Sequence, residues 1–190
     1  MAARKAVNQE LTKEIILETA RDLFVSEGYQ HVTMRKIARS LGYSHGSLYY
    51  HFKNKAELFY SLVAKDFNLL NETLDDILQE DTHVEKKLSS ILLGYIEFGI
   101  KHPDHYRVMF LMQEESLQSK LQQEPNVTYE KFASVLHALS GNQMDPRLIW
   151  SIFLSLHGFV AYYCGLPELT YEDVKGMAEQ HVQFLLNGLR

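Results

Sequence analysis

The feature that most constrains the fold is the spacing of apolar residues, which recur every three or four positions along nearly the whole chain. Such spacing places them on one face of an α-helix, whereas a half-buried strand would alternate every two residues. No strand-like alternation persists beyond a few residues, and no internal repeat or low-complexity segment is visible. We therefore expect an all-α protein with about nine helices.

Three helices are expected at the N-terminus. The first covers 12–27, and the second begins at Thr33 and ends before Gly42. Ser44 can cap a third helix only two residues later, because a serine hydroxyl accepts a hydrogen bond from an exposed N–H group at a helix start. Two short helices across a glycine-containing turn are the signature of a helix-turn-helix.

A long helix is expected to begin near Lys55 and to keep one apolar face over about 24 residues. It could link the N-terminal head to the rest of the chain, the body. Later helices are expected at 84–102, 104–122, 128–140, 146–164 and 171–189. This pattern predicts a helix-turn-helix domain over 1–54 and a larger helical domain over 55–190.

Composition limits the compartment and the chemistry. The single cysteine, Cys164, excludes an intrachain disulfide and a cysteine-based zinc site, and it suits a reducing cytoplasm. The first residues carry charges without an apolar run, so no secretory signal is visible. No apolar stretch approaches the ~20 residues that a membrane span needs. We expect a cytoplasmic protein with no cofactor and no metal ion.

Charge is distributed unevenly along the chain. Residues 1–55 hold nine Lys/Arg against five Asp/Glu, while the remaining residues hold ten against nineteen. A basic head on an acidic body indicates that only the head meets a polyanion such as double-stranded DNA. An uneven surface without a function stays open as the alternative.

The segment SHGSLYYHFKNK (44–55) carries the residue types best suited to contact DNA. Helical spacing turns Leu48 and Phe52 toward the core and leaves hydroxyl, imidazole and phenol groups outside, which can bind phosphate or read base edges. A small aromatic cluster that closes the head against the long helix is the alternative. The predicted DNA contacts are Thr33, Arg35, Ser44, His45, Gly46, Ser47, Tyr49, Tyr50, His51 and Lys55.

The run VTMRKIARSLGYSHGSLYYHFKNKAEL (32–58) resembles the TetR family of bacterial transcriptional regulators. That family's pattern has Thr or Ser opening the second helix, an Ile-Ala pair, a glycine turn and a recognition helix reading roughly S-x-G-x-L-Y-x-H/Y-F. The matching residues are Thr33, Ile37-Ala38, Gly42-Tyr43, Ser44, Gly46, Leu48-Tyr49, His51-Phe52, Lys55 and Leu58. The body resembles the family only in length and helix count.

The resemblance implies a homodimer that binds a pseudo-palindromic operator, most often as a repressor that a small molecule releases. By position, Thr33, Tyr50 and Lys55 are similar to phosphate-binding residues of the family. His45, Ser47 and Tyr49 are similar to residues that reach bases or nearby phosphates. His45 departs from the pattern, because members often carry Lys, Arg or a larger polar residue there.

The last two helices are the expected dimer interface. Each carries an apolar stripe, and two such helices from each of two chains would form a four-helix bundle, as the resemblance implies. Alternatively, both stripes are filled within one chain. The predicted interface residues are Ile152, Leu156, Val160, Tyr163, Val174, Met177, His181 and Leu185.

Bulky aromatic residues in the body could line a pocket for a small apolar or aromatic ligand, although an ordinary core contains the same residue types. Trp150 followed by His157-Gly158 resembles a Trp…His-Gly pattern in the C-terminal domains of some TetR-like proteins. A hydrogen-bonded core histidine is the alternative for His157. The predicted ligand residues are Tyr95, Phe98, Tyr106, Phe110, Trp150, Phe153 and His157.

Two other functions stay open from the sequence. A ligand-independent structural DNA-binding protein is disfavoured, because the acidic body would weaken non-specific coating of DNA. An enzyme is disfavoured because the chain has no nucleophile elbow, Gly-rich phosphate loop or HExxH motif. His102 and His105 could bind a metal ion, but solvated helix-end residues explain them more simply.

Overall fold

The computed structural model describes residues 10–112, 123–141, 144–166 and 168–188. Within these ranges the regular structure is entirely helical, with nine α-helices, one 3-10 turn and one π-helical segment. The prediction of an all-α protein is therefore confirmed. Among the helices in these ranges, none combines the length and the apolar character of a membrane span.

The head consists of α1 (Lys13–Glu27), the 3-10 turn η1 (Tyr29–His31), α2 (Met34–Leu41) and α3 (His45–Tyr49). The expected caps are present at all three α-helices. The hydroxyl oxygens of Thr12, Thr33 and Ser44 accept hydrogen bonds from backbone N–H groups three residues later, at 3.1–3.3 Å. Gly42 has a φ of 77°, a left-handed conformation that costs glycine little, and it turns the chain from α2 to α3.

Helical spacing also identified the core of the head correctly. Leu48 is fully buried and Phe52 is 2% exposed, so both side chains pack inward as expected. Regular α-helix ends at Tyr49, but the backbone N–H of Phe52 still donates to the carbonyl of Leu48, which extends the turn. The residues between them are left on the outer side of the head.

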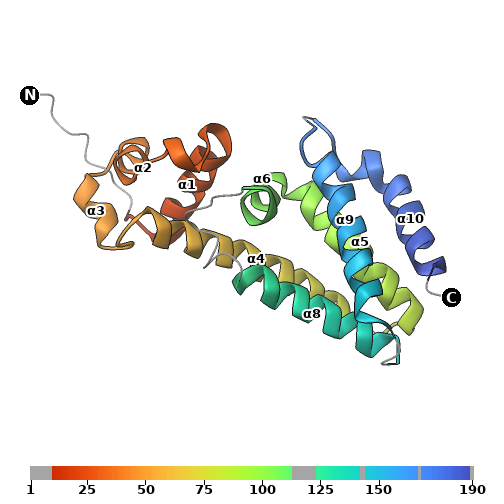
Figure 1. Ribbon diagram of the computed structural model, residues 1–190. Coiled ribbons are helices and arrows are strands. Elements are labelled where there is room, and N and C mark those ends of the chain that lie inside the picture. The colour runs from red at the N-terminus through yellow and green to blue at the C-terminus, as the bar shows by residue number, and fades with distance from the viewer. Residues whose placement is uncertain (1–9, 113–122, 142–143, 167, 189–190) are drawn as a thin grey trace, which may run out of the picture.

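The body is built around α4 (Lys55–Gln79) and α5 (Val84–Lys101), which pack along each other. Figure 1 shows α4 running from the head along the lower edge of the body, with α8 (Gln123–Leu139) beside its far half. α9 (Pro146–Tyr163) and α10 (Tyr171–Asn187) both pack on α5, and α10 forms the outer side of the molecule. This arrangement places the head and α10 at opposite ends.

One predicted helix is wrong. A single helix was expected over 104–122, whereas α6 (Pro103–Tyr106) passes directly into the π-helical segment η2 (Arg107–Leu111). Met112 then leaves helical geometry with φ −84° and ψ 99°, and 113–122 lies outside the described residues. α8 also begins earlier than expected, so Pro125 falls in its first turn, where proline is tolerated.

A buried ion pair joins the head to the body. The guanidinium of Arg21, on α1, donates to both carboxylate oxygens of Asp66, on α4, at 2.5 and 3.3 Å. The side chains are 7% and 0% exposed, so neither charge has water as an alternative partner. Nδ1 of His105, on α6, lies 3.0 Å from the same carboxylate, although without the angles of a hydrogen bond. Three helices therefore meet at Asp66.

Asp66→Asn should destabilise the protein strongly. The substitution keeps the side-chain shape but leaves the Arg21 guanidinium buried without a counter-charge. We expect a loss of about 3–5 kcal/mol in the free energy of unfolding, measured by urea denaturation. The control is Asp75→Asn, because Asp75 pairs with Lys131 at the surface and is 50% exposed. That change should cost about 0–1 kcal/mol, and equal losses in the two variants would contradict the assignment.

Candidate DNA interface and helical body

The outward face of α3 presents the polar side chains that the sequence predicted. His45 and Gly46 are exposed, Tyr49 is 45% exposed and Tyr50 is 91% exposed. A phenol ring in water buries no apolar area, so Tyr50 has no packing role in the chain itself. Thr33 and Arg35 at the start of α2 are exposed as well.

Two of the predicted DNA contacts, Ser44 and Ser47, form a hydrogen bond within the chain. The hydroxyls of Ser44 and Ser47 share a hydrogen bond of 2.6 Å, and both side chains are half-buried. Their hydroxyls therefore fix the start of α3. His51 is likewise half-buried. His45 and Tyr49 pack edge to face with ring centroids 4.8 Å apart, so they act as one unit on the exposed face.

Lys55 sits in the first turn of α4, with Asn54 as the N-cap. Its ammonium donates to the backbone carbonyl of Tyr29 at 2.8 Å and lies 3.9 Å from the centroid of the Tyr29 ring. The side chain is half-buried and therefore has a defined position at the outer end of the head.

The number of Lys and Arg residues in the head is larger than the number of positive charges that are free to contact DNA. Arg21 forms a buried ion pair with Asp66, and Lys36 forms an ion pair with Glu27. Arg35 and Arg39 remain exposed on α2. Sequence counting missed this distinction, although Arg21 carries a signal: it lies four residues after Leu17 and three before Phe24, inside the apolar stripe of α1.

The comparisons with known proteins agree with this geometry. The sequence pattern described as "Bacterial regulatory proteins, tetR family" matches residues 16–62. Nucleoid occlusion factor SlmA of Pectobacterium carotovorum subsp. carotovorum (strain PC1) is 32% identical over 167 residues, which cover 82% of this chain and 83% of the relative. The chain belongs to the TetR family. It is accordingly a DNA-binding transcriptional regulator of this family.

Other similar proteins extend the comparison. Nucleoid occlusion factor SlmA of Serratia proteamaculans (strain 568) is 29% identical over 127 residues. This match covers 65% of the present chain and 64% of that relative. Among solved structures, the fatty acid degradation regulator FadR from Bacillus halodurans has a TM-score of 0.76 at 20% identity, covering 96% of this chain and 98% of that one. FadR from Bacillus subtilis, in complex with stearoyl-CoA, has a TM-score of 0.76 at 19% identity, covering 94% and 100%. At these identities the two structures show a common fold.

The predicted dimer residues divide into two groups. Ile152, Leu156, Val160 and Val174 are at most 2% exposed, because they fill the chain's own core. The prediction that these four residues contact a partner chain is therefore wrong, because their side chains are not accessible at the surface. Met177 is 46% exposed, and Tyr163, His181 and Leu185 are half-buried.

The outer face of α9 and α10 holds large apolar residues that the sequence did not assign to the dimer interface. Leu154 is 48% exposed, Tyr162 70% and Phe184 74%. His181 links the two helices by a 3.1 Å hydrogen bond with the Ser155 hydroxyl and by stacking on Phe159. This outer face, defined by Leu154, Ser155, Gly158, Tyr162, Met177, His181 and Phe184, is a contiguous helix pair with exposed apolar groups.

Six of the seven predicted ligand residues gather in one aromatic cluster in the body. Its members are Tyr95, Tyr106, Phe110, Tyr129, Phe132, Trp150, Phe153 and His157, with ring centroids 4.7–6.4 Å apart. Phe98 is instead packed against His102 at the end of α5. Sequence reasoning left out Tyr129, which helical spacing cannot distinguish from an ordinary core residue.

The cluster contains a buried polar chain. The hydroxyls of Tyr95 and Tyr106 share a hydrogen bond of 3.1 Å, and the Tyr106 hydroxyl shares one of 2.5 Å with Nδ1 of His157. Burial raises the pKa of both phenols and lowers the pKa of His157 below its usual value. These three hydrogen-bonded side chains are therefore uncharged near neutral pH. At its other end, Trp150 stacks on Phe153 and is 46% exposed, so the cluster reaches the surface there.

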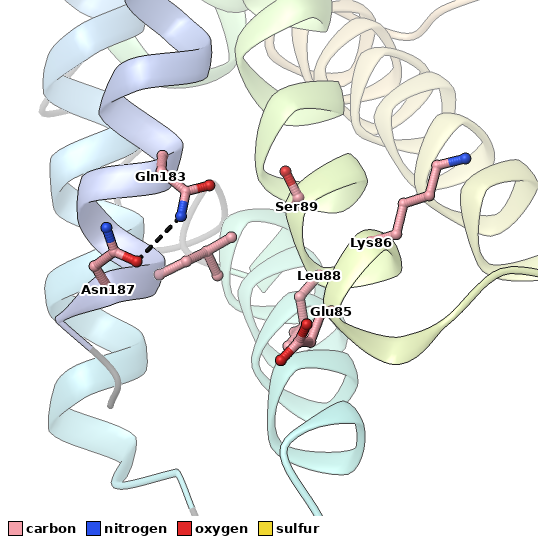
Figure 2. Close-up of a pocket in the computed structure, with 7 residues that line it drawn as sticks. Glu85, Lys86, Leu88, Ser89, Gln183 and Asn187 are labelled. Atoms are coloured by element: carbon pink, nitrogen blue, oxygen red, sulfur yellow. Dashed lines mark hydrogen bonds between the residues drawn. The ribbon is translucent and has the colours of Figure 1, made fainter.

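Three grooves on the described surface lie away from the aromatic cluster. One of about 410 Å³ separates the start of α5 from the end of α10, where the side chains of Gln183 and Asn187 are hydrogen-bonded to each other (Figure 2). Another of about 540 Å³ runs along α4 beside Asp66 and His105. A third, of about 350 Å³, lies between α4 and α5, and of the predicted ligand residues only Phe98 lines any of these three.

Tyr49→Ala should remove sequence discrimination. Tyr49 is exposed on α3, so its loss changes few contacts within the chain. We expect the ratio of operator affinity to random-duplex affinity to fall by about tenfold, measured by fluorescence anisotropy. The control is the neighbouring Tyr50→Ala, which should weaken both duplexes alike. If Tyr49→Ala kept the wild-type ratio, α3 would not read bases through this residue.

Proposed function

We propose that the protein is a repressor that binds a pseudo-palindromic operator as a homodimer and that a small apolar or aromatic ligand in the body releases it. The observation that carries the proposal is the exposed face at α3, where Tyr50 has no packing role and Tyr49, among the ring contacts of the described residues, packs only edge to face on the exposed His45 ring. Phosphate contacts from Thr33, Tyr50 and Lys55 would set the register on the duplex, and His45 and Tyr49 would read base edges.

The outer face of α9 and α10 supports the homodimer. Tyr162 and Phe184 expose large apolar rings, which is unfavourable in a monomer and common where helices meet a partner. Gly158, four residues before Tyr162 on α9, is exposed and has no atom within 4 Å of where a Cβ would stand, so a partner helix could approach closely. Two copies of this helix pair, related by a two-fold axis, would place two heads on one duplex, and operator half-sites would follow the same symmetry.

The aromatic cluster supports control by a ligand. An apolar or aromatic ligand that inserts beside Trp150 would displace packing around Phe153 and His157, and the His157–Tyr106 hydrogen bond leads from there to α6. The ligand would then favour a state whose heads are mis-spaced for the operator, and it would lower DNA affinity by the ratio of its two affinities.

A second function is favoured by the curated relatives. The relative that is 32% identical is named a nucleoid occlusion factor, and the aromatic cluster is already packed with the chain's own rings. A ligand-independent protein that occupies many sites across the nucleoid would keep the same head and the same dimer. It differs from a repressor in the number of genomic sites and in its response to ligands.

Sequencing of protein-bound genomic DNA, followed by footprinting, tests the two functions. The repressor predicts a few sites at promoters, each with a palindromic footprint. Many dispersed palindromic sites without promoters would favour the nucleoid function. Uniform coverage without a shared sequence would contradict both.

Phe184→Glu should convert the dimer to a monomer. The side chain is 74% exposed, so the charge adds little strain within one chain but would be buried against the same face of a partner. The measurement is mass by multi-angle light scattering. Gln183→Glu adds the same charge at an exposed position on the side of α10 that faces the groove beside the start of α5, about 100° around the helix from Phe184, and should leave the dimer intact. A dimeric Phe184→Glu variant would move the interface elsewhere.

A further inference from the structure

One buried aromatic residue of the head touches a predicted DNA contact. Tyr29, in the 3-10 turn after α1, is 6% exposed, and both its ring and its carbonyl face the Lys55 ammonium. We propose that Tyr29 is a positioning residue for DNA binding, which holds the Lys55 ammonium at the start of α4 where it meets a DNA phosphate. The inference rests on the proposed DNA interface.

The position of Lys55 is electrostatically unfavourable without a partner. It occupies the first turn of a 25-residue helix, where the unpaired N–H groups give the helix end a partial positive charge. Acidic residues are preferred at such positions, so a lysine there needs compensation. A local conflict of this kind is expected at functional positions, because the cation serves a ligand rather than the helix.

Tyr29 supplies the compensation through two groups. Its carbonyl oxygen accepts a hydrogen bond from Nζ of Lys55 at 2.8 Å, and its ring face lies 3.9 Å from the same atom, well inside the range of a cation–π contact. Both attract the ammonium from one side. The cation is therefore fixed in direction as well as in distance.

The surroundings make Tyr29 a rigid support. Its ring packs against Phe24 and Phe59 with centroids 5.4 and 4.9 Å away, so it is anchored to both α1 and α4. Its carbonyl also accepts a hydrogen bond from the backbone N–H of Val32 at 3.3 Å. A flexible lysine loses side-chain entropy when it binds a phosphate, and an anchored partner removes part of that loss before DNA arrives.

The geometry places this lysine at the DNA-facing end of the head. Figure 1 shows α3 and the start of α4 joined by a short connection at the same end of the molecule. That connection contains Tyr50, a predicted phosphate contact that is 91% exposed. A phosphate bound between Tyr50 and Lys55 would meet an ammonium already oriented by Tyr29.

A double-mutant cycle on a fluorescein-labelled random-sequence 30-base-pair duplex tests the proposal, because a phosphate contact does not depend on sequence. Lys55→Ala should weaken binding by about tenfold and lower the salt slope by about one. Tyr29→Leu, which removes the ring but keeps an apolar side chain and the carbonyl, should weaken binding by about threefold. Tyr29→Phe should bind like the wild type.

The decisive comparison is Tyr29→Leu in the Lys55→Ala background. The proposal predicts no further loss of affinity there, because the residue that Tyr29 positions is absent. An equal loss in both backgrounds would assign Tyr29 to the stability of the head and overturn its positioning role, while leaving the phosphate contact intact. If Lys55→Ala itself bound DNA like the wild type, both the contact and the positioning role would fail.

A second measurement does not depend on the fold of a variant. In the wild-type protein without DNA, the ε-protons of Lys55 should be shifted upfield in an NMR spectrum relative to those of the exposed Lys53, because they lie over the face of a ring. The shift should persist in Tyr29→Phe. A Lys55 signal at the position of an exposed lysine would overturn the proposal.

Discussion

The buried ion pair between Arg21 and Asp66 is the contact on which the arrangement of the molecule depends. It joins α1 of the head to α4 of the body with both charges excluded from water. Breaking such a pair leaves an uncompensated buried charge, so the head has one strongly preferred orientation on α4. A helix-turn-helix can read an operator as a dimer only if the two heads keep a fixed spacing. The ion pair supplies this constraint within each chain.

The second consequence concerns α6, which lies between the junction and the aromatic cluster. Its consecutive residues His105 and Tyr106 face different partners: His105 lies beside Asp66, and Tyr106 is hydrogen-bonded to His157. A helix of four residues followed by a π-helical segment has few hydrogen bonds of its own, so its position depends on contacts with the neighbouring helices, among them those of His105 and Tyr106. Repacking in the cluster would therefore act on the junction through adjacent residues.

Much of the fold could be predicted because caps and glycine stops are local signals, and Leu48 and Phe52 packed as their spacing indicated. The exposed face of α3 followed from the same argument. Hydrophobic spacing failed at two places for physical reasons. It finds the buried face of a helix, so for the dimer interface it selected Val160 and Val174 and did not select Tyr162 and Phe184 on the outer face. It also cannot distinguish π-helical from α-helical hydrogen bonding, which hid the change after Tyr106. Contacts between distant segments, such as Tyr29 with Lys55, have no local signal.

The most direct test is the distance between the two heads of the proposed dimer. Nitroxide labels on Ser40→Cys, at an exposed position of α2, would report this distance by pulsed electron paramagnetic resonance, since the native Cys164 is buried. The account predicts one narrow distance distribution for the wild-type ion pair, and a broad distribution when Asp66→Asn is added. A broad distribution with the ion pair intact, or the same narrow distribution without it, would contradict the claim that this pair fixes the heads.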